Sequence, residues 1–154
     1  MKKTTTNPKT EAFRSLSRAY SDASILMHEA IARKAGLSGT DHKYLGLILQ
    51  KKELTAGDLA QLTGLSTGAV TGLIDRLEKK ELVKRQFTKD DRRKVLIVPQ
   101  KQNAMDLMAP LFADLQTKTL ELIASFSETE LQVIERYFTE AIQIMEETTQ
   151  SLNQ

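Results

Sequence analysis

The chain has 154 residues, of which 40% are hydrophobic and 27% charged, and its formal net charge is +2. This balance is typical of one soluble globular domain with an ordinary hydrophobic core. Because the chain contains no cysteine, disulfide frameworks, thiol catalysis, iron–sulfur clusters and cysteine-based zinc sites are excluded. The longest unbroken aliphatic run is only Val95–Val98, so we expect no signal peptide, no membrane-spanning helix and a cytoplasmic location.

Charge and glycine are unevenly distributed along the chain. Residues 1–101 contain 20 Lys or Arg and 11 Asp or Glu, a net charge of +9, whereas residues 102–154 contain 2 and 9, a net charge of −7. All seven glycines lie between Gly36 and Gly72. A basic first part can bind a polyanion, while an acidic second part faces solvent or a protein partner.

Two helices are predicted at the start of the chain. In residues 10–35, apolar side chains recur every three or four positions, which predicts an amphipathic helix. Asn7-Pro8 is a suitable start for it. Two glycines within residues 35–39 interrupt the pattern, and a second, more apolar helix is predicted over residues 40–51.

A helix-turn-helix unit is predicted next. Thr55 and Asp58 have the spacing of a capping box, in which a hydroxyl and a carboxylate satisfy the first amides of a short helix. Residues 63–66 then supply a glycine that can adopt a left-handed backbone and Ser66 as a new N-cap. A further helix is predicted over residues 67–80. Two helices joined by about four residues that include a glycine are typical of the helix-turn-helix.

The segment that follows changes from a helical to a strand pattern. Residues 82–87 and 94–98 are β-prone and flank a charged tip, which predicts a hairpin. The helical pattern returns from about residue 100 to residue 125, and Pro110 should kink this helix or mark a late start. A capping box at residues 127–130 predicts the last helix.

The order of these elements predicts a winged helix, a mainly α-helical fold with a small β-hairpin wing. The hairpin follows the helix-turn-helix directly, and residues 84–94 contain six cations and two anions. Such a cluster can contact the phosphates on both sides of a DNA groove, with an affinity that falls steeply with salt. The alternative is a protein-interaction module without DNA binding, whose charged wing docks on an acidic protein. The small residues at the start of residues 67–80 favour DNA, because they suit a groove.

Two stretches combine helix-turn-helix and wing features, namely LTAGDLAQLTGLSTGAVTGLIDRLEKKELVKR and DDRRKVLIV. Within the first, Ala60, Gly64, Val70 and Leu73 match the small residue, turn glycine and two aliphatic residues of helix-turn-helix proteins. With these residues the chain resembles, over most of its length, the multiple antibiotic resistance regulator (MarR) family of winged-helix transcription factors. The resemblance implies a transcription regulator. The sequence contains no nucleophile with a base at readable spacing and no phosphate-binding glycine loop, so we expect no enzyme activity.

The resemblance also implies which residues contact double-stranded DNA. In the family the second helix of the unit enters the major groove with its N-terminal half, which here carries small and hydroxyl-bearing residues that allow a close approach. At the wing tip, the family has an Asp that holds an Arg two residues later extended into the minor groove, and Asp91 and Arg93 match this pair. Arg76 is the candidate for a backbone phosphate. The complete predicted DNA-binding set is Thr55, Ser66, Thr67, Gly68, Thr71, Gly72, Arg76, Arg85, Lys89, Asp91, Arg92, Arg93 and Lys94.

Three features depart from the family pattern. Glu81 stands where the family usually has the glycine that ends the recognition helix, so this helix must end without the residue that most easily adopts a left-handed backbone. Pro99-Gln100 replaces the usual Leu-Thr after the wing, and we expect the second strand to stop at Val98. Family members that sense oxidants use a cysteine, which is absent here, so thiol-based sensing is excluded.

A small-molecule effector is a further implication of the resemblance. The family often binds aromatic carboxylates and other phenolic compounds between the long helices and the DNA-binding lobe. The candidates to line such a site are Tyr20, His28, His42, Lys43 and Tyr44, although ordinary packing explains them nearly as well. Two histidines on separate helices are a weak basis for a metal site, so we expect neither a metal nor a cofactor.

The helices predicted in residues 10–35 and 100–150 are long for a chain of this size. Helices of roughly 24–26 residues are about 36–39 Å long, more than a lobe formed by residues 40–99 can cover, so apolar side chains need a partner unless they complete a monomeric core. We therefore expect residues 1–154 to be a single chain that forms a homodimer through these helices. Its recognition helices would meet half-sites about 34–36 Å apart on a pseudo-palindromic operator. We expect a repressor that its ligand releases.

Overall fold

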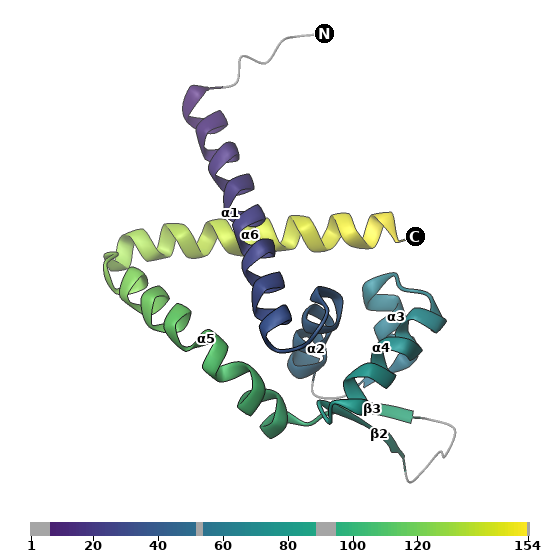
Figure 1. Cartoon of the computed structure of the whole chain (residues 1–154). Coiled ribbons are helices and arrows are strands. Elements are labelled where there is room, and N and C mark those ends of the chain that lie inside the picture. Colours follow the sequence, from purple (N-terminus) through teal and green to yellow (C-terminus); the bar gives the residue numbers. More distant parts are fainter. Residues whose placement is uncertain (1–6, 52–53, 89–94, 154) are drawn as a thin grey trace.

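The computed structural model of the chain describes residues 7–51, 54–88 and 95–153. Its elements in chain order are α1 (Pro8–Lys34), α2 (Gly39–Lys51), β1 (Leu54–Thr55), α3 (Ala56–Thr63), α4 (Thr67–Lys79), β2 (Val83–Phe87), β3 (Val95–Pro99), α5 (Lys101–Ala124) and α6 (Glu128–Leu152). A lobe contains α2, α3, α4 and the sheet; the long helices α1 and α5 extend from it, and α6 starts at the far end of α5 and crosses α1 (Figure 1). The predicted fold class, mainly α-helical with a small wing, is confirmed.

The predicted helix starts are present. Thr55 and Asp58 form the capping box of α3, and Ser127 and Glu130 form that of α6. The side chain of Ser66 accepts a hydrogen bond from the backbone of α4 at 3.3 Å. Each of these caps satisfies amides that have no partner within the helix, so each helix begins within a residue or so of where the sequence predicted it.

Left-handed residues end both helices of the helix-turn-helix. Gly64, which follows α3, has a φ of 70°. At the end of α4, Glu81 has a φ of 57° and is the only described residue other than glycine with a positive φ. The amides of Glu81 and Leu82 donate to the carbonyl oxygens of Glu78 and Leu77, at 2.9 and 3.0 Å. These are the two hydrogen bonds of a Schellman motif, with Glu81 in the position that glycine usually occupies.

The sheet has the strand order β1-β3-β2, and both pairs are antiparallel. The sequence analysis did not predict β1, because two residues carry no alternation of their own. The expectation that the second wing strand stops at Val98 was wrong, because Pro99 pairs with Val83. The neighbouring hydrogen bond runs from the Gln100 amide to the Leu82 carbonyl at 2.9 Å, so this pair does not need the N–H that proline lacks.

The hydrophobic core lies in the lobe. Its largest fully buried side chains are Leu45, Ile48, Leu59, Val70, Leu73, Ile74, Leu77, Leu82, Val83 and Ile97. Among the long helices, α1 contributes Ala32 and α5 contributes Ala104, while no residue of α6 is buried. The core therefore fixes α4 and the sheet firmly and holds α1 and α5 only at their lobe ends.

The long helices expose many large apolar side chains. Edge-to-face and tilted ring pairs join α1 to α6, with centroids 4.9 Å apart for Phe13 and Tyr137 and 6.3 Å apart for Tyr20 and Phe138. Most of the remaining apolar side chains lie in the open, among them Leu16, Leu26, Leu120, Leu122, Ile142, Ile144 and Met145. Of the two alternatives predicted at Pro110, a kink or a late start, the late start is wrong, because α5 begins at Lys101 and passes through Pro110. Within the described residues, no helix combines the length and apolarity that crossing a membrane requires.

Candidate nucleic-acid interface

The N-terminal half of α4 presents a small, polar surface. Thr67, Gly68 and Thr71 are exposed on this helix, together with its N-cap Ser66, and Gly72 is half-buried. The opposite face of α4 is buried in the core through Val70, Leu73, Ile74 and Leu77. No side chain from Ser66 to Gly72 is charged, so the positive end of the helix dipole is not neutralised there. The structure thus brings five of the predicted DNA-binding residues onto one exposed helix end.

Thr55 lies at the start of α3 and acts there as a helix cap. Its hydroxyl donates to Oδ2 of Asp58 at 2.8 Å and accepts a hydrogen bond from the Asp58 amide at 3.1 Å. These bonds use both the donor and one acceptor site of the hydroxyl. Contact between Thr55 and DNA stays a prediction.

Arg76, on the C-terminal half of α4, forms an ion pair with Asp41 of α2. Its Nε donates to Oδ2 of Asp41 at 2.9 Å and to Oδ1 at 3.2 Å, and its Nη2 donates to Oδ1 at 2.7 Å. These hydrogen bonds to Asp41 raise the pKa of Arg76. The role of Asp41 was not predicted from the sequence, because the residues around Asp41 give no indication of a partner 35 positions away.

Arg85, on β2, is held by two carboxylates of α4. Its Nη2 lies 2.6 Å from Oδ1 of Asp75, its Nη1 donates to Glu78, and its backbone amide donates to Oε1 of Glu78 at 2.9 Å. Partial burial lowers the pKa of Arg85, but the hydrogen bonds to Asp75 and Glu78 outweigh this effect and raise it. Arg85 thus ties the wing to α4, and its predicted contact with DNA stays a prediction.

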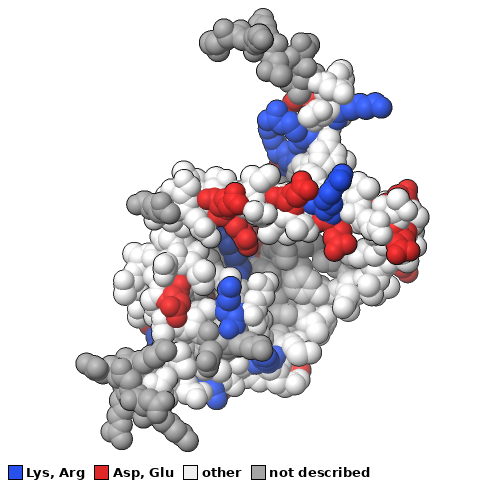
Figure 2. All heavy atoms as spheres, turned by 180° about the vertical axis from the view of Figure 1, so that it is seen from behind, with Lys and Arg blue, Asp and Glu red and all other residues white. Residues whose placement is uncertain are grey.

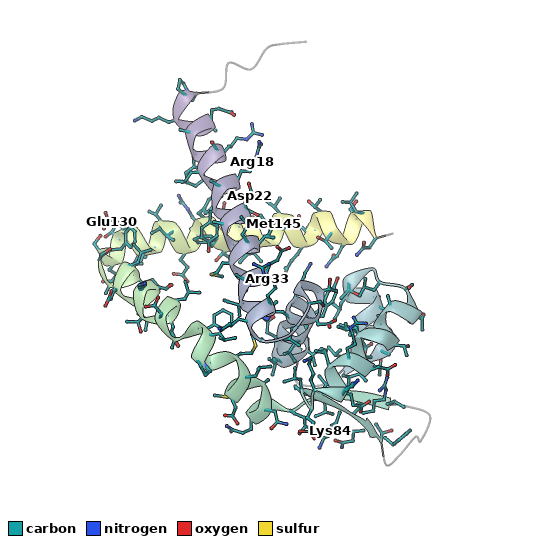
Figure 3. All side chains as sticks on the ribbon, viewed as in Figure 1. Arg18, Asp22, Arg33, Lys84, Glu130 and Met145 are labelled. Carbon is teal, nitrogen blue, oxygen red and sulfur yellow. The ribbon has the colours of Figure 1, made fainter. Side chains whose placement is uncertain are left out.

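The remaining predicted wing residues, Lys89, Asp91, Arg92, Arg93 and Lys94, lie outside the described residues. Lys84, labelled in Figure 3, is exposed on β2. In Figure 2, basic and acidic side chains are interspersed over the visible face, and the described residues there form no continuous basic surface. The sequence concentrates positive charge in this wing tip, with four cations and two anions in residues 89–94.

A cavity of about 870 Å³ lies between α1, α2 and α5. Four of the five candidate ligand residues line it, namely His28, His42, Lys43 and Tyr44. Tyr20 is not among the residues that line it, and its ring packs against Phe138 of α6. Four of the residues predicted together therefore share one cavity, whereas Tyr20 lies elsewhere on α1.

The two histidines of this cavity are in direct contact. Nδ1 of His28 lies 3.1 Å from Nε2 of His42, a hydrogen bond in which one ring donates an N–H to the lone pair of the other. Phe112 of α5, which the sequence analysis missed, has its ring 6.0 and 6.1 Å from the two imidazoles. Burial, and then the neighbouring His28, lower the pKa of His42. No group of three or more potential metal ligands occurs among the described residues.

Comparison with known proteins identifies the family. A model described as the MarR family matches residues 35–94. The HTH-type transcriptional regulator YcgE of Bacillus subtilis is 39% identical to this chain over 142 residues, which cover 90% of each protein. The chain belongs to the MarR family. As a MarR-family protein it is a DNA-binding transcriptional regulator and not an enzyme.

Solved MarR-family structures share this fold. A MarR family protein from Bacillus stearothermophilus superposes with a TM-score of 0.69 at 23% identity, covering 91% of this chain and 98% of that one. A point mutant of MepR from S. aureus, bound to an oligodeoxyribonucleotide, superposes with a TM-score of 0.57 at 18% identity, covering 91% of this chain and 99% of that one. The likeness to MarR structures thus extends beyond the lobe to the long helices.

Proposed function

We propose that this MarR-family regulator binds a pseudo-palindromic operator as a homodimer and represses transcription until a small ligand releases it. One observation carries the proposal. The N-terminal half of α4 is small, polar and exposed, whereas the opposite face of α4 is locked in the core. A helix held in this way can enter a major groove without moving relative to its lobe. MepR, which has the same fold, has been solved with an oligodeoxyribonucleotide, and this supports the proposal.

The DNA-binding lobe in this proposal comprises residues 40–99. Ser66, Thr67 and Thr71 offer hydroxyls to phosphates and base edges, and the glycines between them allow a close approach. The wing tip supplies Arg93, held extended by Asp91, to the minor groove. Lys89, Arg92 and Lys94 add phosphate contacts, which position the lobe without reading sequence.

The dimerisation helices in this proposal are residues 10–35 and 100–150. Several large apolar side chains on them are more than half exposed, including Leu16 at 67%, Ile144 at 64% and Met145 at 68%. An opening of about 310 Å³ also lies between α1 and α6 and is lined by Phe13, Val133 and Tyr137 among others. A second copy of the chain can cover these surfaces, since isolated soluble proteins rarely leave such large apolar patches in water.

The effector site in this proposal is the cavity between α1, α2 and α5. Lys43 and the His28–His42 pair can bind a carboxylate or phenolate oxygen, and the ring of Phe112 can pack against an aromatic ligand. The cavity lies between the lobe and the long helices, so a ligand there can change the distance between the two lobes of a dimer. Phenols and aromatic carboxylates are the candidate effectors in this proposal.

The decisive experiment is DNA binding by an Arg93→Ala variant, measured by fluorescence anisotropy on fragments selected by genomic footprinting. We expect a loss of affinity of at least tenfold at physiological salt, and the slope of log affinity against log salt should fall by about the contribution of one cation–DNA contact. Lys9→Ala is the control, because it removes one positive charge from the exposed start of α1, outside the proposed DNA-binding lobe and dimerisation helices. Unchanged affinity of the Arg93→Ala variant refutes the wing assignment, and absent or salt-insensitive binding by the parent favours the protein-interaction module.

Two further measurements test the assembly and the effector. Sedimentation equilibrium should give the mass of a dimer, and a monomer at micromolar concentration contradicts the proposed dimerisation helices. Titration of benzoate and 4-hydroxybenzoate into the protein–DNA complex should lower the anisotropy in at least one case. If neither compound nor any related phenol releases DNA, the protein is a constitutive binder.

A further inference from the structure

Asp41 is the only charged side chain that is buried among the described residues, with 4% of its surface exposed. It lies in the first turn of α2. Removing a carboxylate from water is costly unless another group compensates its charge. For Asp41 this group is the guanidinium of Arg76. Both oxygens of Asp41 accept from that guanidinium. The pair therefore joins α2 to α4 at a fixed point.

Gly72 leaves space for the guanidinium of Arg76. A Cβ added to Gly72, one turn earlier on α4, would lie 3.3 Å from Nη1 of Arg76. This is closer than most side-chain contacts, so the absence of a side chain at Gly72 leaves room for the guanidinium to reach α2. We call Asp41, Arg76 and Gly72 the α2–α4 clasp.

The α2–α4 clasp sets the rotation of α4 about its own axis, which the apolar contacts of its buried face do not. Val70, Leu73 and Leu77 hold α4 against the core, but apolar contacts are not directional and allow a helix to rotate slightly about its axis. A bidentate pair between a guanidinium and a carboxylate has a defined geometry. It fixes which side chains α4 turns outward, and these are the residues that would face DNA.

We infer that Asp41 is a positioning residue for DNA binding, which acts through Arg76 to set the orientation of α4, and that Arg76 is the anchor of this helix instead of a phosphate contact. The inference rests on the proposed function, since it takes α4 as the recognition helix. It reassigns Arg76, and it gives Gly72 the role of making room for the guanidinium.

The two roles of Arg76 predict opposite effects for Asp41→Asn. If Arg76 binds a phosphate, the substitution removes a negative charge from the lobe and frees the guanidinium, so DNA affinity should rise. If Arg76 is the anchor, the same substitution loosens α4 and DNA affinity should fall. Arg76→Lys separates the roles as well, because lysine keeps the charge but cannot make the bidentate pair.

The test is anisotropy of full-length parent, Asp41→Asn, Arg76→Lys, Arg76→Gln and the Asp41→Asn/Arg76→Gln double variant on one DNA fragment over a range of salt. We expect each single substitution to lower affinity at least tenfold, and the double variant to bind no more weakly than the weaker single variant. The slope of log affinity against log salt should stay that of the parent in Arg76→Gln, whereas loss of a phosphate contact reduces it by about 0.9.

The inference is overturned if Asp41→Asn binds as tightly as the parent or more tightly, or if Arg76→Gln lowers the salt slope by about one contact. Circular dichroism and a thermal melt check that each variant is folded. If Asp41→Asn does not fold, affinity and slope of the two Arg76 variants decide the question. A parent protein that fails to bind any DNA refutes the proposed function, and the inference falls with it, whereas a binding parent with unaffected variants refutes the inference alone.

Discussion

Glu81 stores backbone strain at the end of α4, and replacing it by glycine should stabilise the protein. A left-handed backbone costs a residue with a Cβ about 1–2 kcal/mol, and Glu81 has a φ of 57°. Glycine avoids this cost but loses about 0.5–1 kcal/mol more conformational free energy on folding than alanine does. The expected net gain in the free energy of unfolding is about 0.5–1 kcal/mol.

The hydrogen bonds at this helix end should survive the substitution. The Schellman bonds use backbone atoms, and Nδ2 of Asn103 donates to the backbone oxygen of Glu81 at 2.8 Å. Backbone strain is therefore the main property of the folded state that Glu81→Gly changes. The expected gain in the free energy of unfolding is not reduced by the loss of a side-chain contact.

Urea unfolding followed by circular dichroism measures the effect of Glu81→Gly. Parent and variant must be compared at one protein concentration, because subunit assembly makes stability depend on it. Lys80→Gly is the matched control, since Lys80 has an ordinary φ of −93° and glycine there should destabilise by about 1 kcal/mol. If Glu81→Gly is no more stable than the parent while Lys80→Gly is destabilised, the strain argument is refuted.

Two further substitutions test the turn and the histidine pair. Gly64→Ala places a Cβ on a backbone with a φ of 70°, 3.4 Å from Oδ1 of Asn153, and should lower the free energy of unfolding by about 1–2 kcal/mol; parent-like urea stability contradicts the left-handed turn. Because the pKa of His42 is lowered from 6.5, the unfolded chain takes up the proton more readily. Neutral His42 contributes its full stability above about pH 6.5, and this contribution is lost as the pH falls below that value. The melting temperature should therefore decline less between pH 8 and pH 5 in His42→Gln than in the parent. Equal declines contradict the lowered pKa of His42.

The sequence predicted the helix boundaries well because their determinants are local. Thr55 and Asp58 are three residues apart, as are Ser127 and Glu130, and each pair forms the expected capping box. The turn at Gly64 depends on one residue that tolerates a left-handed backbone. Such features can be read from four or five consecutive residues without knowledge of the rest of the fold.

The partners of the arginines could not be predicted in the same way. Arg76 pairs with a residue 35 positions earlier in the sequence, and Arg85 pairs with two carboxylates on a different element. From the sequence alone, an arginine held within the protein looks the same as one free to bind DNA. Phe112 was missed for a similar reason, since its apolar side chain on α5 fits an ordinary helix face, and only packing places it beside His28 and His42.

These ion pairs shift the expected source of electrostatic attraction for DNA from the helix-turn-helix to the wing tip. Residues 54–88 contain five cations and four anions, and two of those cations, Arg76 and Arg85, are held by carboxylates of the same lobe. The net charge of +9 over residues 1–101 therefore says little about the helix-turn-helix itself. With four cations and two anions in residues 89–94, the wing tip supplies most of the salt-dependent affinity in the proposed function, while the uncharged end of α4 supplies the fit. For this reason Arg93 should control the strength of DNA binding, and Asp41 its geometry.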